Sequence, residues 1–559
     1  MADSAKAKKN PSVKTSAPKV IFVVGGVMSG VGKGVAASSI ALLLQARGLK
    51  VTALKIDPYI NVDAGTMDPT EHGEAFVLSE GLETDQDMGN YERFLNLDLP
   101  NINYMTTGRV YQAVIEKERR GGYKGRNVQV VPDIPEEAIR RIKMAAQQAE
   151  ADVAVVEIGG TIGEYENVLF LETIRLLKHR EPDNVAVVMV SYLPVPGSIG
   201  EMKTKPTQHA ARTLGSAGVQ ADIIIARSNV AIDKKRKEKI SNFCNVSLEH
   251  VIAAPDVASI YDIPVNFEKD KLSANLMELL KLPVTKAVNL RAWKNFLLSR
   301  EQATGTVRVA VIGKHFSSGD FVLSDVYLSV LEALKFSAAK LGVTCEVEYL
   351  PASDFTSKKG LERLDNYQGV LIPSSFGKEG VEGELAVITY LREQQIPFLG
   401  IGFGMQLAVI EFARRLLGLK KATSAEIDPK AIELVIEPIA DIPEHHMEGR
   451  WIRLGSHEID LIKESVVGEA YNKATIQERH RHSFAVNHDY LEALQEKGLV
   501  VSATSTAGES MIVEAVELPK HQHPFFVGTQ FQPELQARPL VPNPLVTAFL
   551  AAALAKKRE

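Results

Sequence analysis

The sequence predicts an α/β protein with two domains, each a doubly wound, mostly parallel sheet. From residue 19 to about residue 280, short β-branched apolar runs alternate with helical patterns, and most of these runs end in a polar or glycine turn. A second series of the same kind begins at residue 307. Near-continuous apolar runs are typical of strands that helices cover on both faces, as in parallel sheets. The 559 residues suffice for about two to four domains with sizeable cores.

The expected elements follow in order along the chain. An apolar run at 20–24 and a helical pattern at 36–44 flank a glycine-rich loop. Further strands are expected at 51–56, 153–156, 185–190 and 223–226, and the second series starts with a strand at 307–313. The predicted organisation is a disordered tail at 1–18, a first domain at 19–282, a linker without a strand at 283–305, and a second domain at 306–559.

The composition argues against several classes of function. A formal net charge of −5 disfavours a large nucleic-acid interface, which needs a basic face. The two cysteines, Cys244 and Cys345, rule out a disulfide framework and suit a reducing cytosol. The apolar runs are shorter than the roughly 18 residues of a membrane span, and residues 1–18 lack the apolar centre of a signal peptide. We therefore expect a cytoplasmic protein without a nucleic-acid or membrane partner.

The glycine-rich loop at 25–34 is the first candidate site. A strand, a glycine turn and a helix in this order direct backbone N–H groups toward an anion, and Lys33 would reach the outer phosphates of a nucleotide. The spacing departs from the usual phosphate-binding motif, because five residues separate Gly26 from Gly32 and Gly34 stands where Ser or Thr would hold magnesium. The loop alone fits either a nucleotide site or a plain glycine-rich turn.

Two acidic positions are candidates for a magnesium site. Polar residues at 55–67 follow the second expected strand and fall at the carboxyl edge of the sheet, where ligands of such sheets bind. Asp87 lies in an acidic segment that suits a hard cation or, alternatively, a solvated loop. Glu157 ends a buried apolar strand, where a carboxylate is costly unless it is paired or binds a metal. Glu157 therefore makes a metal site the stronger interpretation.

A basic segment at 203–208 is the third candidate. Pro206 suits the first turn of a helix, which leaves Lys203 and Lys205 just before the helix N-terminus. A helix dipole with two lysines suits a triphosphate. The alternative is a solvated basic turn.

These segments resemble the CTP synthase family, glutamine amidotransferases that convert UTP to CTP. The matching segments are 25–34, 55–67, 83–94, 106–111, 118–125, 156–163, 203–209 and 243–246. The resemblance covers nearly the whole chain and implies a phosphate-loop amidoligase domain followed by a class I glutaminase-like domain. It further implies that the first domain binds ATP, Mg²⁺ and UTP, that ATP phosphorylates the uracil 4-oxygen, and that ammonia displaces the phosphate.

The resemblance assigns roles by matching position. The implied catalytic residues are Lys33 and Lys55, the magnesium ligands are Asp87 and Glu157, and the contacts to the feedback inhibitor CTP are Glu164, Tyr165 and Glu166. The implied ATP and UTP contacts are Ser29, Gly30, Val31, Gly32, Lys33, Gly34, Val35, Lys203, Thr204, Lys205, Pro206, Thr207, Gln208, Lys239, Asp256 and Val257. Departures from the family pattern are Glu164 for Asp, Gly30 for Ser, and Val195-Pro196 for Tyr and an apolar residue.

The second domain resembles a class I glutaminase that has lost its catalytic pair. Gly402 stands where the family has the catalytic Cys, and Gln532 stands where it has the catalytic His, so that only Glu534 remains. Glycine offers no nucleophile, and glutamine is not a general base. Neither Cys244 nor Cys345 lies where it could replace the nucleophile.

Three further changes accompany this loss. Ser374 and Ser375 occupy an oxyanion turn where the family has two glycines, Glu379 replaces an Arg that serves the activator GTP, and Ser483-Phe484 replaces Arg-Tyr. The changes fit neutral drift in an unused domain or a pocket rebuilt for another amine or a regulatory ligand.

We therefore expect ATP-dependent amination of UTP to CTP with free ammonia as the nitrogen donor and with an inactive glutaminase domain. Two alternatives stay open: ligation of a different amine to UTP, and a non-catalytic nucleotide-binding paralogue. The resemblance also implies a homotetramer and permits filaments.

Overall fold

The computed structural model describes residues 17–26, 28–197, 200–283, 286–314, 317–318, 321–322, 324–439, 446–447, 450–508 and 510–558. The chain forms two compact units. The first unit is Met1–Ile60 with Met105–Asn289, and the second is Asn61–Tyr104 with Leu290–Glu559. Most of the predicted disordered tail, and Val27 of the glycine-rich loop, lie outside the described residues.

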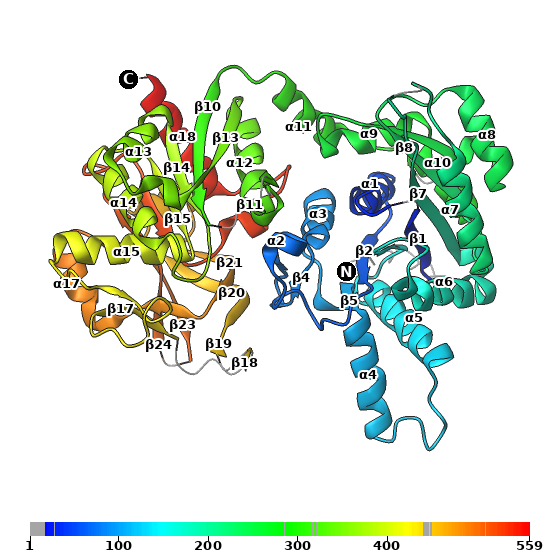
Figure 1. Ribbon diagram of the computed structural model, residues 1–559, viewed down its shortest axis with the longest axis horizontal. Helices are drawn as coiled ribbons and strands as arrows, with labels where there is room; N and C mark the ends of the chain where they lie inside the picture. Colours follow the sequence, from blue (N-terminus) through cyan, green and yellow to red (C-terminus); the bar gives the residue numbers. More distant parts are fainter. Residues whose placement is uncertain are drawn as a thin grey trace, which may run out of the picture. The chain divides into compact units, whose positions relative to one another are not determined.

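The first unit is built on a seven-stranded sheet in the order β5-β2-β6-β1-β7-β8-β9 (Figure 1). Its strands are β1 (Lys19–Gly26), β2 (Val51–Asp57), β5 (Tyr104–Thr106), β6 (Val153–Ile158), β7 (Val185–Tyr192), β8 (Ile223–Ser228) and β9 (Val251–Pro255). The central strand β1 pairs in parallel with β6 and β7, and the pairs β2–β6, β7–β8 and β8–β9 are also parallel. The predicted parallel sheet is confirmed.

Helices cover both faces of this sheet. They are α1 (Lys33–Ala46), α4 (Thr107–Arg119), α5 (Val130–Gln148), α6 (Val168–Arg180), α7 (Lys205–Ser216), α8 (Lys234–Cys244), α9 (Ile263–Lys269) and α10 (Leu272–Leu279). Helix α1 packs with α9 and α10, whereas α5 packs with α6 (Figure 1). Every residue of β2 and β6 is buried as a result, which explains why the sequence shows continuous apolar runs and not alternation.

The second unit contains a nine-stranded sheet in the order β13-β10-β14-β15-β25-β24-β23-β20-β21. The strands are β10 (Thr306–Gly313), β13 (Thr344–Pro351), β14 (Gly369–Ile372), β15 (Phe398–Ile401), β20 (Arg453–Leu461), β21 (Thr475–His482), β23 (Val500–Ala507), β24 (Ser510–Leu518) and β25 (Phe526–Thr529). The pairs from β13 to β25 are parallel and those from β25 to β21 are antiparallel. The predicted α/β class is confirmed, and the antiparallel half is an addition that the sequence pattern did not reveal.

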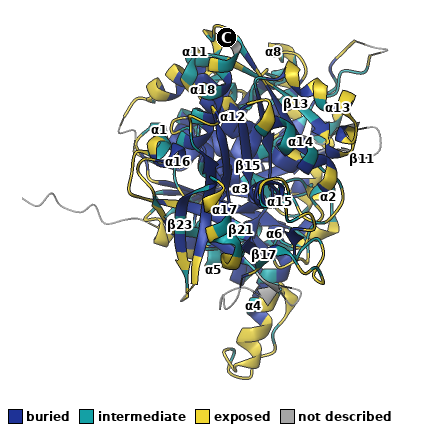
Figure 2. Cartoon of the chain, turned by 90° about the vertical axis from the view of Figure 1, so that its left-hand side faces the viewer, coloured by how far each residue is buried: buried dark blue, intermediate teal, exposed yellow. Residues whose placement is uncertain are grey.

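The main helices of the second unit enclose the parallel half of its sheet. They are α12 (Leu328–Leu341), α14 (Val381–Glu393), α15 (Phe403–Leu416) and α18 (Pro544–Arg558). Helix α12 packs with α18, and α14 packs with α15. Figure 2 shows the strands in dark blue inside this shell, as expected for a sheet that is covered on both faces.

The segment Asn61–Tyr104 belongs to the second unit although it precedes most of the first unit in sequence. It carries α2 (Pro69–His72), β3 (Phe76–Val77), β4 (Glu83–Thr84) and α3 (Gln86–Leu95). The segment 283–305, expected to be a linker, contains helix α11 (Arg291–Glu301). Trp293 of α11 is buried, and its ring centroid lies 5.1 Å from that of Phe94 in α3. The domain boundaries inferred from the sequence stay a prediction.

Candidate active site

The glycine-rich loop of the first unit has the backbone that an anion site needs. Gly30 and Gly32 have positive φ angles of 70° and 82°, which glycine adopts at little cost. Gly32 is the N-cap of α1, which begins at Lys33. Successive N–H groups in such a turn, together with the helix N-terminus, provide a concave donor surface for phosphate. The predicted strand–loop–helix arrangement is confirmed.

The Lys33 side chain lies across the end of β1 and close to the end of β6. A Cβ atom at Gly25 would lie 2.7 Å from Lys33 Cδ and 3.2 Å from the Gly160 carbonyl oxygen. Only glycine at position 25 leaves room for this path of the lysine side chain. The structure therefore brings the lysine to the carboxyl edge of the sheet, where the sequence placed the ligand.

A buried lysine–carboxylate cluster lies at the same edge. Lys55 of β2 and Glu157 of β6 are register partners, and Lys55 Nζ donates a hydrogen bond of 3.1 Å to Glu157 Oε1. Lys55 Nζ also lies 3.7 Å from Asp57 Oδ1. All three side chains are at least nine-tenths buried. Two predicted residues, Lys55 and Glu157, are thus brought together.

Asp57 is a residue of this cluster that the predicted site lacked. The signal was present in the sequence, since side chains two apart on a strand share a face and Lys55 already belonged to the site. Buried carboxylates at the carboxyl edge have the oxygen ligands that Mg²⁺ prefers, and phosphate oxygens supply the rest of its octahedral shell. Glu157 and Asp57 therefore fit a magnesium ion.

The second predicted magnesium ligand, Asp87, belongs to the other unit. It lies in the first turn of α3, where its backbone N–H is capped by Asp85 Oδ1 at 2.8 Å. Asp87 and Glu157 are in different units, so their joint coordination of a metal stays a prediction. Within the described ranges, no cluster of three or more His, Cys, Asp or Glu side chains has the arrangement of a metal site.

Four of the predicted nucleotide contacts line one cavity of about 150 Å³ in the first unit: Gly32, Val35, Asp256 and Val257. Arg227 of β8 also lines it and donates a hydrogen bond of 2.9 Å to Asp256 Oδ1. The remainder of the wall is largely apolar, with Ile225, Ile260 and Phe267 among its residues. An apolar slot beside a phosphate loop suits the flat base of a nucleotide.

The predicted triphosphate segment lies at the N-terminus of α7. The expected helix start with Pro206 in its first turn is confirmed, although Lys205 is the first helical residue and not, as expected, a residue before the helix. Lys203 Nζ donates to Glu201 Oε2 at 2.7 Å, and Thr207 Oγ1 lies 2.8 Å from Ser191 Oγ at the end of β7. Lys239 lies on the neighbouring helix α8.

The predicted CTP contacts follow β6. Glu164 accepts a hydrogen bond of 2.9 Å from the Thr161 backbone N–H, and its carboxylate occupies the space over Gly160, where a Cβ would lie 2.3 Å from Oε2. Tyr165 and Glu166 lie in the short 3₁₀ helix Tyr165–Asn167, and the Tyr165 ring is 93% exposed. This exposed ring is free to stack on a ligand, but the structure does not test the role.

In the second unit, Gly402 lies at the turn between β15 and α15. Its φ of 55° and ψ of −108° are strained for any residue with a side chain. A Cβ at this position would lie 2.6 Å from Ser374 Oγ and 3.0 Å from Ser374 Cβ. The Ser374 side chain thus occupies the space that a residue-402 side chain would need.

Gln532 and Glu534 lie just after β25. The Gln532 backbone N–H donates to the Arg479 carbonyl at 2.8 Å. Burial raises the pKa of the Glu534 carboxyl well above its ordinary value, and the carboxyls of Glu74 and Glu478 add to the effect. The raised pKa disfavours the ionised form of Glu534, whereas the carboxylate that orients a catalytic histidine is ionised.

Most of the altered positions line one cavity of about 660 Å³, which we call the elbow cavity. Its lining includes the changed residues Ser374, Ser375, Ser483, Phe484 and Gln532, together with Glu534. Of the other two changed positions, Gly402 is not a lining residue, and Glu379 is exposed. The substitutions that the sequence showed as scattered are therefore neighbours around a single hollow.

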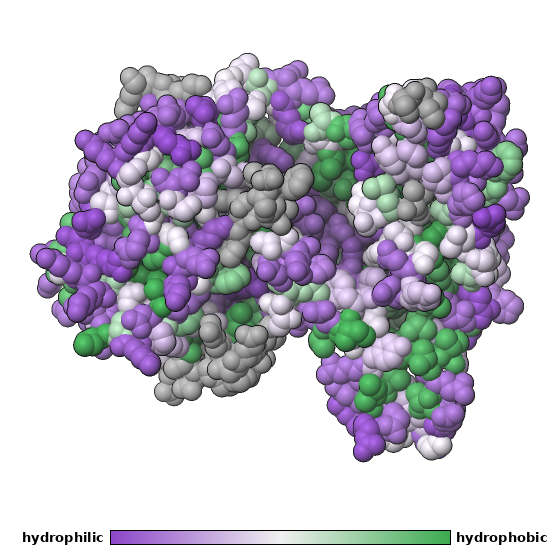
Figure 3. All heavy atoms as spheres, viewed as in Figure 1, coloured by the Kyte–Doolittle hydropathy of each residue, from purple (hydrophilic) through white to green (hydrophobic). Residues whose placement is uncertain are grey.

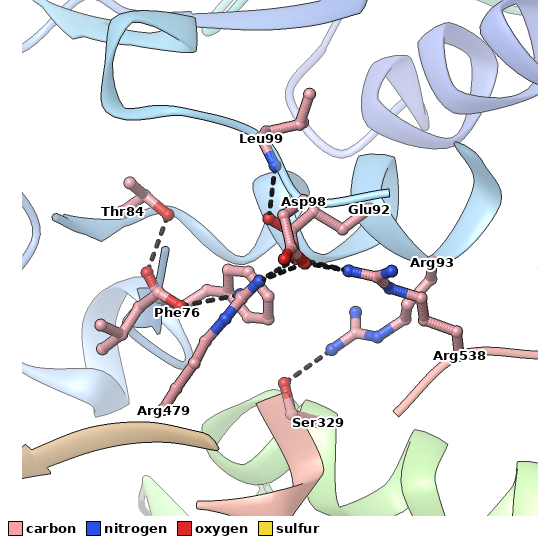
Figure 4. A network of polar contacts seen from close by, with 10 residues as sticks. Phe76, Thr84, Glu92, Arg93, Asp98, Leu99, Ser329, Arg479 and Arg538 are labelled. Carbon is pink, nitrogen blue, oxygen red and sulfur yellow. Dashed lines mark hydrogen bonds and ion pairs between the residues drawn. The ribbon is translucent and has the colours of Figure 1, made fainter. Parts of the chain in front are cut away.

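Strand β21 links the elbow cavity to the segment Asn61–Tyr104 through Arg479, whose side chain is fully buried (Figure 4). Its Nη2 contacts Glu92 Oε2 at 2.7 Å and Asp98 Oδ1 at 2.9 Å, and its Nη1 donates to the Val77 carbonyl at 2.9 Å. The guanidinium lies 5.3 Å from the centroid of the Phe76 ring. Sequence reasoning missed this network, since its partners lie 381 to 402 positions away.

A unit with a parallel sheet and a phosphate loop, in one chain with a unit that has a glutaminase-type elbow, is the architecture of an amidoligase joined to a class I glutamine amidotransferase domain. Family models agree: the CTP synthase N-terminus matches residues 19–282, and the class I glutamine amidotransferase matches residues 322–552. The chain belongs to the CTP synthase family.

Two named relatives support this assignment over nearly the full length. A CTP synthase of Pyrococcus furiosus is 44% identical, over 97% of this chain and 99% of its own length. A CTP synthase of Thermococcus kodakarensis is 44% identical, over 96% of this chain and 99% of its own. A solved glutaminase domain of Trypanosoma brucei CTPS with bound acivicin is 31% identical, with a TM-score of 0.41, over 44% of this chain and 94% of that chain.

The helices of the described part of the chain are all too short or too polar to cross a bilayer.

Proposed function

We propose that the protein forms CTP from UTP in an ATP-dependent amination that uses free ammonia and not glutamine. ATP transfers its terminal phosphoryl group to the uracil 4-oxygen, ammonia attacks carbon 4, and phosphate leaves as the amine loses a proton. Membership of the CTP synthase family supports the substrates. One observation supports the loss of glutamine use: Ser374 fills the space of the missing nucleophile at Gly402.

The residues of the first unit have the chemistry for this reaction. The backbone N–H groups from Ser29 to Val35 and the Lys33 ammonium would hold the phosphates, as would the segment from Lys203 to Gln208 with Lys239. Lys55 would stabilise charge that develops on the transferring group. Glu157 and Asp57 would hold Mg²⁺, which supplies positive charge to the phosphates. Asp87, which belongs to the second unit, is the further Mg²⁺ ligand that the family resemblance implies.

The recognition of each nucleotide follows the same assignment. Asp256 and Val257 line the cavity that would take the ATP base. Glu164, Tyr165 and Glu166 would contact CTP as a feedback inhibitor. We also propose a homotetramer formed through the first unit, as the family resemblance implies.

Initial rates of CTP formation test the proposal. Purified protein with UTP, ATP and Mg²⁺ should form CTP with ammonium chloride, and the rate should rise with pH as the share of unprotonated NH₃ grows. Glutamine in place of ammonium should give no CTP. Lys33→Ala should lower the turnover at least 100-fold, by analogy with the loss of one transition-state donor. Lys50→Ala removes an exposed lysine of the same unit and should leave the rate unchanged.

The two alternatives predict different results in the same assay. Ligation of another amine would give an N4-substituted product, visible by mass spectrometry, with little CTP from ammonium. A non-catalytic paralogue would bind UTP or CTP without turnover. CTP formation from ammonium at a steady rate would exclude a non-catalytic paralogue and would weaken the case for ligation of another amine.

A further inference from the structure

We infer that the elbow cavity binds a small primary alkylamine in its protonated form. The inference goes beyond the proposed function, which needs only ammonia and the residues that hold nucleotide and metal. Three features of the cavity support the inference: its unpaired hydrogen-bonding atoms, its carboxyl groups and its apolar surface.

Four side chains of the cavity wall that are more than nine-tenths buried carry a hydrogen-bond acceptor without a partner among the described residues. They are Gln406 Oε1, His482 Nε2, Gln532 Oε1 and Glu534 Oε2. The hydroxyl of Ser375, a partly buried wall residue, also lacks a partner and can accept or donate. A buried polar atom without a partner is unfavourable, so a ligand that brings donors to this wall gains affinity.

Neighbouring contacts fix two of these atoms as acceptors. The Gln406 amide nitrogen donates to the Phe484 carbonyl and to Gln530 Oε1, both at 3.2 Å, which leaves its oxygen unpaired. His482 Nδ1 donates to the Phe484 carbonyl at 3.0 Å, so Nε2 carries a lone pair. Burial lowers the pKa of His482 to about 3, and the ring is therefore neutral at pH 7.

An ammonium group matches such a wall because it has three N–H donors and no acceptor. A carboxylate, a phosphate or an alcohol would bring further acceptors to a surface that already has too many. The hydrogen-bonding pattern thus selects a cationic nitrogen compound.

The carboxyl groups of the wall point the same way. They belong to Asp68, Glu74, Glu426 and Glu534, whereas Arg481 is the basic lining residue. Burial raises the pKa of Glu74 to about 7, so a bound cation would favour ionisation of Glu74 as well as of Glu534. Arg481 Nε is already bonded to Glu83 Oε1 at 2.6 Å. Lys314 lies behind the wall, where its Nζ donates to the Gly377 carbonyl at 2.6 Å and lies 4.2 Å from the centroid of the Phe403 ring. The excess of carboxyl groups disfavours an amino acid with a free carboxylate, including glutamine.

The size and the apolar lining of the cavity favour a ligand that is larger than an ammonium ion and partly apolar. About 660 Å³ far exceeds the roughly 30 Å³ that a water-sized molecule occupies in liquid. Phe376, Phe403 and Phe484, with Val326, Ile452 and Leu535, provide apolar surface. An alkyl chain attached to the ammonium would bury this surface, and the affinity should rise with each added methylene.

Calorimetric titration of the full-length protein with n-butylammonium chloride at pH 7 tests the inference. We expect saturable binding at one site per chain, weaker binding of methylammonium, and no binding of 1-butanol, butyrate or glutamine. Burial raises the pKa of the Glu534 carboxyl, and a bound cation should lower this pKa, so the carboxyl should lose a proton on binding. The apparent enthalpy should then vary with the ionisation enthalpy of the buffer and report release of a proton.

Two variants and a control make the test specific. Glu534→Gln keeps the shape of the carboxyl but cannot ionise, so n-butylammonium should bind at least tenfold more weakly and with less proton release. Gln532→Met removes a second acceptor at similar volume and should also weaken binding, which keeps the test decisive should Glu534→Gln fail to fold. The control is Glu517→Gln, at another buried carboxyl of the same unit. Glu517 accepts hydrogen bonds from the Val466 and Val467 backbone N–H groups and is not among the residues that line the cavity, so this variant should bind like the parent.

Equal binding of 1-butanol, tighter binding of glutamine, or unchanged affinity in both cavity variants would each overturn the inference. Absence of any binding would do the same. The readout is independent of CTP formation, so a protein that aminates UTP but binds no alkylamine would refute only this inference, and the converse result would refute only the proposed function.

Discussion

Ser374 and Gly402 show how two substitutions depend on each other at the scale of single residues. A side chain at position 402 would collide with Ser374 Oγ at 2.6 Å and would also have to adopt a φ of 55°. Backbone strain of this kind amounts to about 1–3 kcal/mol. Loss of the nucleophile at position 402 and the presence of Ser374 are therefore complementary. A cysteine returned at position 402 would still collide with the Ser374 side chain.

Gly402→Cys alone should not restore glutamine hydrolysis and should lower the midpoint of thermal unfolding. The triple variant with Ser374→Gly and Gln532→His should relieve the collision and return a base to the site. Glutamate release, measured by an enzyme-coupled assay, should rise only in the triple variant. Equal glutamate release by Gly402→Cys alone would contradict the steric argument.

Glu478 allows a prediction about pH. Burial raises the pKa of its carboxyl to about 8, compared with an ordinary value of 4.5. Between these pH values the folded state keeps a proton that the unfolded chain loses, so this group lowers the free energy of unfolding as the pH rises. Each pKa unit corresponds to about 1.4 kcal/mol. Glu478→Gln lacks this titration and should gain stability relative to the parent between pH 5 and pH 8.

Urea unfolding at the two pH values measures this difference. The free energy of unfolding of Glu478→Gln minus that of the parent should be larger at pH 8 than at pH 5. A difference that stays constant or shrinks would mean that Glu478 is ionised in the folded protein.

At the level of secondary structure, strand β21 takes part in two hydrogen-bond networks, because its successive side chains alternate between its two faces. Arg479 and Arg481 contact residues of Asn61–Tyr104, whereas His480 and His482 contact Glu514 and Phe484 on the opposite face. Successive side chains of a strand point to opposite faces. One strand thereby anchors an inserted segment and shapes the wall of the elbow cavity.

Arg479→Ala should destabilise the second unit by about 3–5 kcal/mol, because it leaves the buried Glu92 carboxylate without its main partner. The double variant with Glu92→Gln should recover part of this loss. Chemical unfolding followed by the fluorescence of Trp293, which packs beside Phe94 in the same segment, reports the change. Arg481→Ala, at a partly exposed position, should have the smaller effect, and the reverse order would contradict the assignment of Arg479 as the main anchor.

The elements that the sequence predicted well are those whose signal is local. The expected strands at 51–56, 153–156, 185–190, 223–226 and 307–313 all lie within observed strands, because buried parallel strands carry continuous apolar runs. The antiparallel half of the second sheet and helix α11 were missed. Their stability depends on partners distant in sequence, such as Phe94 for Trp293.

The residues of the candidate site also differ in the strength of their sequence signal. Lys33, Lys55 and Glu157 could be singled out because each lies in or next to a recognisable strand or turn, and Asp256 because it matches a family segment. The elbow cavity could not be deduced as one hollow, since Ser374, Ser483 and Gln532 come from separate parts of the chain and only the fold brings them together.

At the scale of the whole molecule, the first unit presents a candidate surface for assembly. Helices α4 and α5 carry exposed apolar side chains at Ile115, Val130, Val131 and Met144, and Figure 3 shows apolar surface gathered over these helices. Exposed apolar patches of this kind mark interaction sites.

The solution mass should therefore be about four times the chain mass of 61.1 kDa, measured by light scattering after gel filtration. Ile115→Glu should shift the mass toward smaller species, because it places a charge in the apolar surface, whereas Lys50→Ala should not. A monomer in the parent protein would refute the proposed tetramer.

For the molecule as a whole, we propose an intact UTP-aminating unit joined to a glutaminase-like unit without glutaminase chemistry. Glutamate and CTP should be measured in parallel during incubation with UTP, ATP, Mg²⁺ and either ammonium or glutamine. We expect CTP from ammonium, no CTP from glutamine, and no glutamate above the background of heat-inactivated protein. Release of glutamate from glutamine in step with CTP formation would show that the glutaminase site is active.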